Sequence, residues 1–334
     1  ICIGKNINGQ YEADSNAKLT LTDSTFIADS YIYLMKNTAG FTTGITMQNF
    51  SVLQAKTIYN GSEIRMNHNS TIKFSGEYIS DGGSIVVDMT GAKAGGFFKL
   101  IDYTGADPAS VNYQNVTLLN GNGYTAVTMN GDLYASNADM SVIQVNSAWA
   151  GNAPGTEVAE GYYFGFNAFD KLSGAADGMT ADTATIKLTG DVEESTDAAA
   201  GAATNRNFNF RATQDLVLTA DDAATIKLTV DDSLKTHGGS TNSTGELAFL
   251  SDSDDRRATI TIDKNVTINT NAKVWFGRTA VTKEVHATDV IINGTINQQK
   301  NTDTNSYGIM QIQSDKGSTV TLNGTIYLDW SLLV

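Results

Sequence analysis

The residues that are able to do chemistry in this 334-residue chain are few and scattered. Its three histidines, His68, His237 and His286, are far apart in the sequence and lack paired-ligand spacing, so we expect them on the surface rather than at a metal ion. Cys2 is the only cysteine, which excludes an internal disulfide and a cysteine-based zinc site. The sequence therefore predicts no catalytic residue, no cofactor site and no metal site.

Two acidic motifs contain the residue types that a glycan-cleaving enzyme or a cation site requires. Inverting hydrolysis of a glycosidic bond needs two carboxyl groups about 6.5–9.5 Å apart, one of them acting as an acid. Residues 301–303 (Asn-Thr-Asp) resemble a polygalacturonase motif, but the Gly-His-Gly and Arg-Ile-Lys elements of such enzymes do not follow. Residues 251–257 (SDSDDRR) offer oxygen ligands to a hard cation, and we interpret them instead as a solvated loop whose charges partly neutralise one another.

Asparagine and aromatic residues allow two further interpretations. Asn-x-Ser/Thr sequences are glycosylation acceptors in secreted eukaryotic proteins. In a chain this rich in Asn and Thr we interpret most of them as turn sequences. They begin at Asn49, Asn60, Asn69, Asn115, Asn242, Asn265, Asn293 and Asn323. Trp149, Tyr162 and Tyr163 are able to stack on sugar rings, but we favour packing within the fold for all three.

The overall composition favours β structure and excludes two classes of partner. Charged residues make up 17% of the chain and hydrophobic residues 41%, while glycine (31 residues) far outnumbers proline (2). β-Branched and turn-forming residues thus replace strong helix formers. A net charge of −14 would repel phosphate backbones and anionic lipids, and no apolar run reaches the roughly 20 residues of a spanning helix. We expect no nucleic-acid partner and no direct membrane insertion.

Short strand patterns recur along the chain as near-copies. Their intervals of about 30–40 residues are typical of repeat architectures. The near-copies are ATIKLTG at 184, ATIKLTV at 224, ATITIDK at 258, DVIINGTI at 289 and STVTLNGTI at 318. Strand sequences that are similar but unequally spaced favour an all-β parallel β-helix (β-solenoid). In this fold the coils stack about 4.8 Å apart, and loops of different lengths extend from the corners. A pair of β-sandwiches is the alternative.

The middle of the chain predicts the end of one solenoid. Residues 116–136 (VTLLNGNGYTAVTMNGDLYAS) indicate an antiparallel meander with turns at residues 120–123 and 130–131, because Asn-Gly tolerates positive φ at both positions. Antiparallel hairpins close a parallel coil rather than continue it. We therefore expect an antiparallel hairpin cap near residues 97–145.

A short capping helix near residues 168–178 is predicted directly afterwards. Asn167 is expected as its N-cap, Asp170 favours its first turn and Gly178 marks its end. Apolar residues follow with 3-4-3 spacing at Phe169, Leu172, Ala176 and Met179. The chain is thus expected to divide into residues 1–145, the last part of a first solenoid, and residues 146–334, which contain the linker, the helix and the first part of a second solenoid.

Several of these segments resemble a known family. Residues 95–105 (GGFFKLIDYTG) and the meander at 116–136 resemble the segment that closes β-helical repeats in autotransporter-like bacterial surface proteins. Residues 145–172 (VNSAWAGNAPGTEVAEGYYFGFNAFDKL) resemble the linker module of large multi-repeat β-helical surface proteins. The resemblance covers residues 95 to about 190, and it implies an extracellular, non-catalytic stalk or adhesin.

The sequence thus predicts a secreted, cell-surface structural or adhesive segment of a larger repeat protein or filament. Because the chain begins with Ile1 rather than Met, we expect a processed or excised piece. The expected partners are other copies or modules of the same protein stacked end to end, and a glycan on a host or cell surface is a further candidate. The alternative is a glycan-active β-helix, such as a polysaccharide lyase, a hydrolase or a phage depolymerase.

Overall fold

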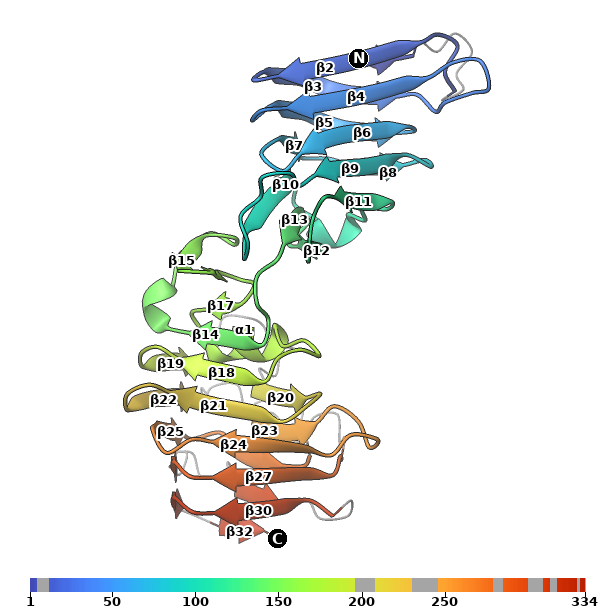
Figure 1. Ribbon diagram of the computed structural model, residues 1–334. Helices are drawn as coiled ribbons and strands as arrows, with labels where there is room; N and C mark the ends of the chain where they lie inside the picture. The colour runs from blue at the N-terminus through green and yellow to red at the C-terminus, as the bar shows by residue number, and fades with distance from the viewer. Residues whose placement is uncertain are drawn as a thin grey trace. The chain divides into compact units, whose positions relative to one another are not determined.

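The protein is built almost entirely from β-strands and divides into two compact units. The computed structural model describes residues 1–4, 12–195, 208–229, 246–278, 285–299, 309–312, 317–328 and 331–333. Unit 1 is Ile1–Ala138 and unit 2 is Asp139–Val334 (Figure 1). The sequence places this division after residue 145, but β14 (Val142–Val145) pairs with strands of unit 2. Among the described residues no helix is long and apolar enough to cross a membrane.

Unit 1 contains two sheets, and most of their neighbouring strands are parallel. The first sheet begins with β1 (Cys2–Ile3), β3 (Thr25–Leu34), β5 (Val52–Asn60), β7 (Thr71–Phe74) and β10 (Phe97–Tyr103), with β8 (Tyr78–Ser80) also pairing with β5. The second sheet contains β2 (Ala17–Thr22), β4 (Thr43–Gln48), β6 (Glu63–Asn67), β9 (Ser84–Asp88) and β11 (Val116–Leu119). Until β10 and β11 the chain passes repeatedly from one sheet to the other.

The core of unit 1 consists of apolar residues that stack in register. Because side chains alternate between the two faces of a strand, each strand of the second sheet points two apolar residues inward. Neighbouring strands place these residues opposite one another, in the series Ile45, Ile64, Ile85 and the series Met47, Met66, Val87. All six are buried, and burial of each such side chain contributes roughly 1.5–3 kcal/mol.

An antiparallel hairpin ends unit 1, as the Asn-Gly dipeptides predict in part. β12 (Thr125–Met129) and β13 (Asp132–Ser136) are joined by Asn130 and Gly131, whose φ angles are 51° and 82°. Both positive values are those of the expected two-residue turn. β13 then pairs antiparallel with β10. The meander prediction is wrong for β11, which pairs in parallel with β9 because its inward residues continue the core of the second sheet.

The described part of unit 2 contains three large sheets, in which all neighbouring strands are parallel, and a separate two-stranded sheet. The first contains β17 (Ala168–Phe169), β14, β18 (Thr185–Leu188), β21 (Leu216–Ala220), β24 (Ala258–Ile262), β27 (Thr288–Ile292) and β30 (Thr319–Leu322). The second contains β19 (Val192–Ser195), β22 (Ala224–Thr229), β25 (Val266–Thr270), β28 (Thr295–Gln298) and β31 (Thr325–Leu328). The third contains β20 (Phe208–Ala212), β23 (Glu246–Ser251), β26 (Lys273–Phe276), β29 (Ile309–Ile312) and β32 (Ser331–Leu333).

From β18 onward the chain visits the sheets of unit 2 in a repeating order, and most near-copies occupy one of them. The copies at 184, 258, 289 and 318 form β18, β24, β27 and β30 of the first sheet, whereas the copy at 224 forms β22 of the second. Similar sequences therefore mark parallel strands rather than one fixed position in a repeat. Small elements lie outside the three sheets, namely an antiparallel pair, β15 (Glu157–Ala159) and β16 (Tyr162–Tyr163), and the 3-10 turns Pro108–Ser110 in unit 1 and Ser147–Trp149 in unit 2.

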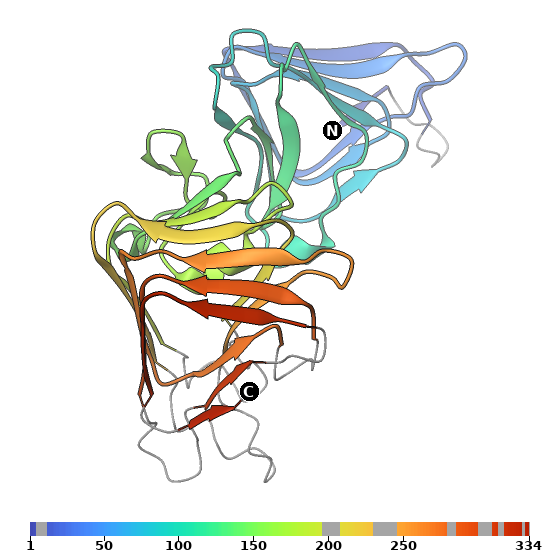
Figure 2. The same cartoon turned by 60° about the horizontal axis from the view of Figure 1, so that its bottom comes forward.

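The three large sheets of unit 2 share one core. Figure 2 shows this unit with its last strands turned toward the viewer. The first sheet contributes a series of apolar residues in register, Ile186, Leu218, Ile262 and Ile292. The third sheet contributes three stacked phenylalanines. Phe249 lies between Phe210 and Phe276, with ring centroids 5.2 and 5.8 Å apart.

The predicted helix is present but shorter than expected. α1 spans Leu172–Asp177, and its N-cap is Lys171 rather than Asn167. The amide of Asn167 is fully buried and used elsewhere: its Oδ1 accepts from the backbone N–H of Tyr163 at 2.7 Å, and its Nδ2 donates to two backbone carbonyls. Residues 168–169 are therefore extended as β17. The helix ends at Gly178, as predicted.

α1 covers part of the unit 2 core and is bonded to the second sheet. Leu172 and Ala175 are buried in that core, and Phe169 packs against it from β17. The carboxylate of Glu194, which lies on β19 and is only 2% exposed, accepts hydrogen bonds from the Ser173 backbone N–H at 3.0 Å and from the Ser173 hydroxyl. A residue distant in sequence thus satisfies an N–H group in the first turn of the helix.

Candidate functional site

Ionisable side chains of unit 2 gather where the chain passes from the third sheet to the first. Successive passes stack on one another because β24, β27 and β30 are paired in register. We call the described residues 252–257, 285–289 and 317–319 the polar corner. In it, Nδ1 of His286 lies 2.9 Å from Oδ1 of Asp254. The SDSDDRR motif is therefore brought beside one of the three histidines.

Two serine hydroxyls lie near the backbone that carries His286. The hydroxyl of Ser318 donates to the backbone carbonyl of His286, and that of Ser251 donates to the backbone carbonyl of residue 287. These hydroxyls are thus bonded to main-chain groups. Among the described residues, no group of three or more His, Cys, Asp or Glu side chains is arranged to hold a metal ion. The pair formed by Asp254 and His286 connects two loops by a hydrogen bond.

Arg257 connects three successive strands of the first sheet at the polar corner. Its Nε and Nη2 atoms donate to the two carboxylate oxygens of Asp289 at 2.7 and 2.6 Å. The same Nη2 donates to the carbonyl of Gly317 at 2.8 Å and to the hydroxyl of Thr319 at 3.1 Å. Hydrogen bonding from Arg257 is the main cause that holds the pKa of Asp289 below its ordinary value. Such a bidentate pair fixes geometry and leaves neither group for acid-base work.

Asparagine side chains also bond from one strand to the next. Nδ2 of Asn323 donates to Oδ1 of Asn293, 30 residues earlier, at 2.9 Å. Nδ2 of Asn265 donates to two backbone carbonyls of the preceding turn. The side chain of Asn60 is fully buried. Nδ2 of Asn115 donates to the backbone carbonyl of residue 83. These five sequon residues therefore have structural roles in turns and corners, as we interpreted most of them.

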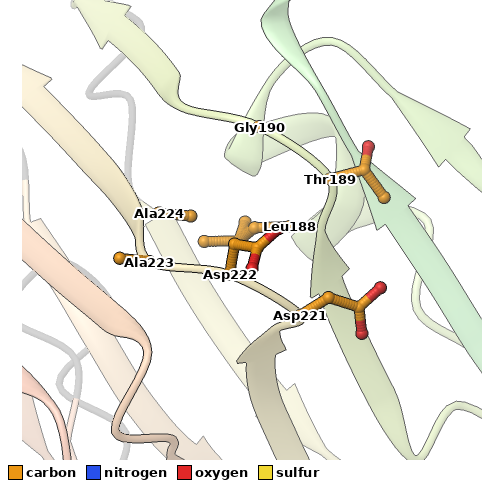
Figure 3. A pocket seen from close by; sticks show the side chains of 7 residues that line it. All are labelled: Leu188, Thr189, Gly190, Asp221, Asp222, Ala223 and Ala224. Atoms are coloured by element: carbon orange, nitrogen blue, oxygen red, sulfur yellow. The ribbon is translucent and has the colours of Figure 1, made fainter.

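A shallow hollow of about 340 Å³ lies between the turns that follow β18 and β21. It is lined by Leu188, Thr189, Gly190, Asp221, Asp222, Ala223 and Ala224. Figure 3 shows the side chains of Asp221 and Asp222 pointing in different directions. Asp221 is also paired with Lys187 at 2.7 Å. The hollow is large enough for a sugar ring, but its two carboxylates do not face each other across it as glycosidase residues do.

A second ionic network, in unit 1, joins β10 to β13. Nζ of Lys99 lies 2.8 Å from Asp132 and 3.2 Å from Asp102, and the Tyr134 hydroxyl donates to Asp132 at 2.9 Å. Burial, the largest single effect, lowers the pKa of Lys99, but hydrogen bonds and charge interactions with Asp132, Tyr134 and Asp102 outweigh it and raise the pKa. Burial and the charge of Asp132 raise the pKa of Tyr134. The groups are therefore held as a stable ion pair and a neutral phenol.

The structure places the remaining candidate residues as follows. His68 is 8% exposed, with its ring 4.8 Å from that of Phe98, so the expectation of a surface position is wrong for it. Tyr163 is buried, whereas Tyr162 and Trp149 are partly buried. Cys2 is exposed and free. The expectations for His237, Asn242 and residues 301–303 lie outside the described residues.

Sequence reasoning singled out Arg257 only as part of SDSDDRR, and it missed Lys99, Glu194 and the partners of all three residues. Arg257, Lys99 and Glu194 each bond to a partner more than 20 residues away. Their partners depend on how many residues separate neighbouring strands, and that number varies. Register partners are 30 residues apart for Asp289 and Thr319 but 44 apart for Leu216 and Ile260. No local pattern therefore identifies the partner of a charged residue.

The polar chemistry of the described residues consists of contacts between neighbouring strands and turns. In unit 2 these contacts centre on the polar corner, and in unit 1 on Lys99. Neither arrangement leaves a set of acid, base and nucleophile converging on an open space. Comparison with known proteins found no matching family model, no matching curated protein and no matching solved structure.

Proposed function

We propose that this chain is a non-catalytic structural segment in which parallel β-solenoids form a scaffold that displays loops. The observation that supports the proposal is that polar side chains bond to neighbouring strands. Arg257, which bonds to Asp289 and to residues of the following strand, is the clearest case. Side chains that would do chemistry in an enzyme are here bonded to the next coil.

The strand pairing of unit 2 supports a solenoid. Strands of the three large sheets follow one another in a repeating order. Each strand pairs in parallel with the next strand of its own sheet along the chain. The β-sandwich alternative would pair many neighbouring strands antiparallel. The resemblance of residues 95–190 to bacterial surface proteins supports an extracellular or cell-surface location.

Engineered disulfides test the solenoid directly. Thr267, Thr295 and Thr325 are register partners on three neighbouring strands, and all three side chains point away from the core. Neighbouring strands lie about 4.8 Å apart, within the Cα separation of a disulfide, whereas strands two coils apart exceed its limit of about 7 Å. In a Cys2→Ser background, Thr267→Cys with Thr295→Cys should therefore oxidise readily. Thr267→Cys with Thr325→Cys is the matched control.

Mass spectrometry of the oxidised proteins gives the result. A bond in the first pair and none within a chain in the control supports stacked parallel coils. A bond in the control, or two free thiols in the adjacent pair under the same oxidant, would rule this strand order out.

A glycan-active β-helix is the second candidate, and the hollow beside Asp222 is the observation that favours it. Pockets of this size with a few polar groups are usual for small ligands. The test is incubation with polygalacturonate, mucin glycans and other acidic polysaccharides. We expect no new reducing ends and no unsaturated products. Turnover that is lost in Asp222→Asn but kept in Asp191→Asn, outside the hollow, would replace the structural proposal with the enzymatic one.

The proposed partners are further modules of the same protein. Within the described part of the chain, β30 and β31 have a paired strand on only one side. Val320 is partly exposed, whereas its register partner Val290 on β27 is buried. We propose that a further coil, from another module or another copy, stacks on this edge. A glycan on a host or cell surface is a candidate ligand for the displayed loops.

A further inference from the structure

Asn-Gly sequences are sites at which a protein can modify itself. The backbone nitrogen of glycine attacks Cγ of the asparagine side chain, ammonia leaves, and a cyclic succinimide forms. Water then opens the ring to aspartate or isoaspartate, so that NH₂ is replaced by OH and no oxidant or reductant takes part. Six such pairs lie within the described residues, beginning at Asn60, Asn120, Asn122, Asn130, Asn293 and Asn323.

Three of these pairs are held in corners by backbone hydrogen bonds from the attacking nitrogen. The N–H of Gly61 donates to the carbonyl of residue 34 at 2.8 Å. The N–H groups of Gly294 and Gly324 donate to carbonyls of the preceding strand at 3.2 and 2.8 Å. In addition, Asn60 is fully buried and Asn293 is bonded to Asn323. Reaction at these pairs requires separation of neighbouring strands.

Two pairs in the closing segment of unit 1 are held by side chains. Nδ2 of Asn120 donates to Oδ1 of Asp88 at 3.0 Å and to the hydroxyl of Thr90 at 3.1 Å. Asn130 lies in the two-residue hairpin turn, and the carbonyl of Gly131 accepts a hydrogen bond from the Tyr113 hydroxyl. A Cβ added at Gly131 would clash with the ring of Tyr103, so this turn is closely packed. Both turns are fixed.

Asn122-Gly123 shares an exposed asparagine side chain with Asn130-Gly131 but differs from that pair in the open space around its glycine. The side chain of Asn122 is exposed and makes no hydrogen bond to a described residue, and only its backbone carbonyl accepts, from Nδ2 of Asn137 at 3.2 Å. A Cβ added at Gly123 would approach nothing closer than 3.4 Å. No hydrogen bond to a described residue is found for the Gly123 N–H. We infer that, among the six described pairs, Asn122-Gly123 is the site of spontaneous deamidation in the folded protein.

The product would change the closing segment of unit 1 in charge and in backbone length. Aspartate adds one negative charge, and isoaspartate also adds a methylene group to the main chain. The reaction accelerates as the pH rises, because the glycine nitrogen attacks after losing its proton. The inference is independent of the proposed structural function, since it depends only on the local fold of six turns.

The test is incubation of the full chain in mildly alkaline buffer, followed by fragmentation mass spectrometry that locates each converted asparagine. Conversion at Asn122 should be at least about tenfold faster than at the other five described pairs, which corresponds to about 1.4 kcal/mol of local opening free energy. In urea all six should react at similar rates. Asn122→Gln should abolish the fast conversion at this position in the native protein, with Asn112→Gln, at an exposed asparagine outside the six pairs, as the control that keeps it.

Each outcome decides the inference. Fast conversion of Asn122 alone among the six described pairs in the native protein, and of all six in urea, supports it. Comparable native rates at Asn130 or Asn323 would overturn it. So would an unreacted Asn122 in a native sample whose unfolded counterpart reacts.

Discussion

At the scale of single residues, the carboxylate of Asp88 joins the end of β9 to a turn 32 residues later. Hydrogen bonds from Asn120 and from the hydroxyl and backbone N–H of Thr90 hold the pKa of Asp88 below its ordinary value of 3.8. A carboxyl group whose pKa is lower in the folded than in the unfolded state contributes stability above pH 3.8. That contribution is lost as the pH falls through the folded pKa.

Replacing Asp88 with Asn is expected to lower the free energy of unfolding at neutral pH by at most about 1 kcal/mol, because the group is near the surface. The variant and the parent should become equally stable below the folded pKa, where the parent carboxyl is protonated too. Urea unfolding over a pH series measures both effects. Asp29→Asn is the control, since Asp29 is exposed and no hydrogen bond to a described residue is found for it. The same pH dependence in both variants would contradict this role of Asp88.

What the sequence predicts about single residues depends on how local their contacts are. The Asn130-Gly131 turn follows from two adjacent residues, so it was predictable and is confirmed. The burial of His68 depends on Phe98, which lies on a strand 30 residues later, and no pattern around His68 indicates it. The bidentate contact of Arg257 depends likewise on the register of three strands.

At the scale of elements, α1 shows why a helix can be predicted while its start is not. Its end at Gly178 and the packing of Leu172 follow from spacing along the chain. Its start depends on Asn167, whose amide is bonded to backbone groups of residues 139, 161 and 163 instead of capping the helix. The acceptor that does serve the first turn, Glu194, comes from the neighbouring sheet.

Removing the Glu194 carboxylate is expected to destabilise unit 2. Glu194→Ala would leave the Ser173 N–H without its acceptor in a buried place, which costs roughly 1–3 kcal/mol. Glu194→Gln retains an acceptor oxygen and should lose less. Urea unfolding compares these variants with Glu193→Ala, which removes the adjacent exposed carboxylate on the same strand. If Glu193→Ala and Glu194→Ala lower stability equally, the bond to α1 has no special role.

At the scale of the whole molecule, the alternation of apolar and polar residues and the turn-forming residues predicted an all-β protein. The structure is nearly all-β, and its sheets are mostly parallel. The pairing partners were less predictable. Parallel neighbours are joined through long connections of variable length, so two similar strands such as those at 184 and 224 can belong to different sheets. The division between the units differs from the expected one for the same reason, since β14 is assigned by its partners rather than by its own sequence.

The edge formed by β30 and β31 is expected to recruit further strands. Leu322 is 51% exposed there, and neither strand carries the charged residues or proline that usually protect an edge. Light scattering should show association that increases with protein concentration and decreases in Leu322→Lys. Thr261→Lys, on a strand paired on both sides, is the control that should leave association unchanged. A monomer at all concentrations would contradict the proposed stacking.

The strand register of the first sheet in unit 2 also determines how many residues the chain can lose during evolution while its strands stay correctly paired. Thr259 and Asp289 are partners, as are Asp289 and Thr319. A deletion that removes residues 259–288 would place Asp289 directly after Ala258 and keep each following inward residue facing inward. A shorter deletion would turn a buried strand over or shift it against its neighbour. Such a deletion removes one strand from each of the three large sheets, so 30 residues is the length change at this place that keeps the strand register.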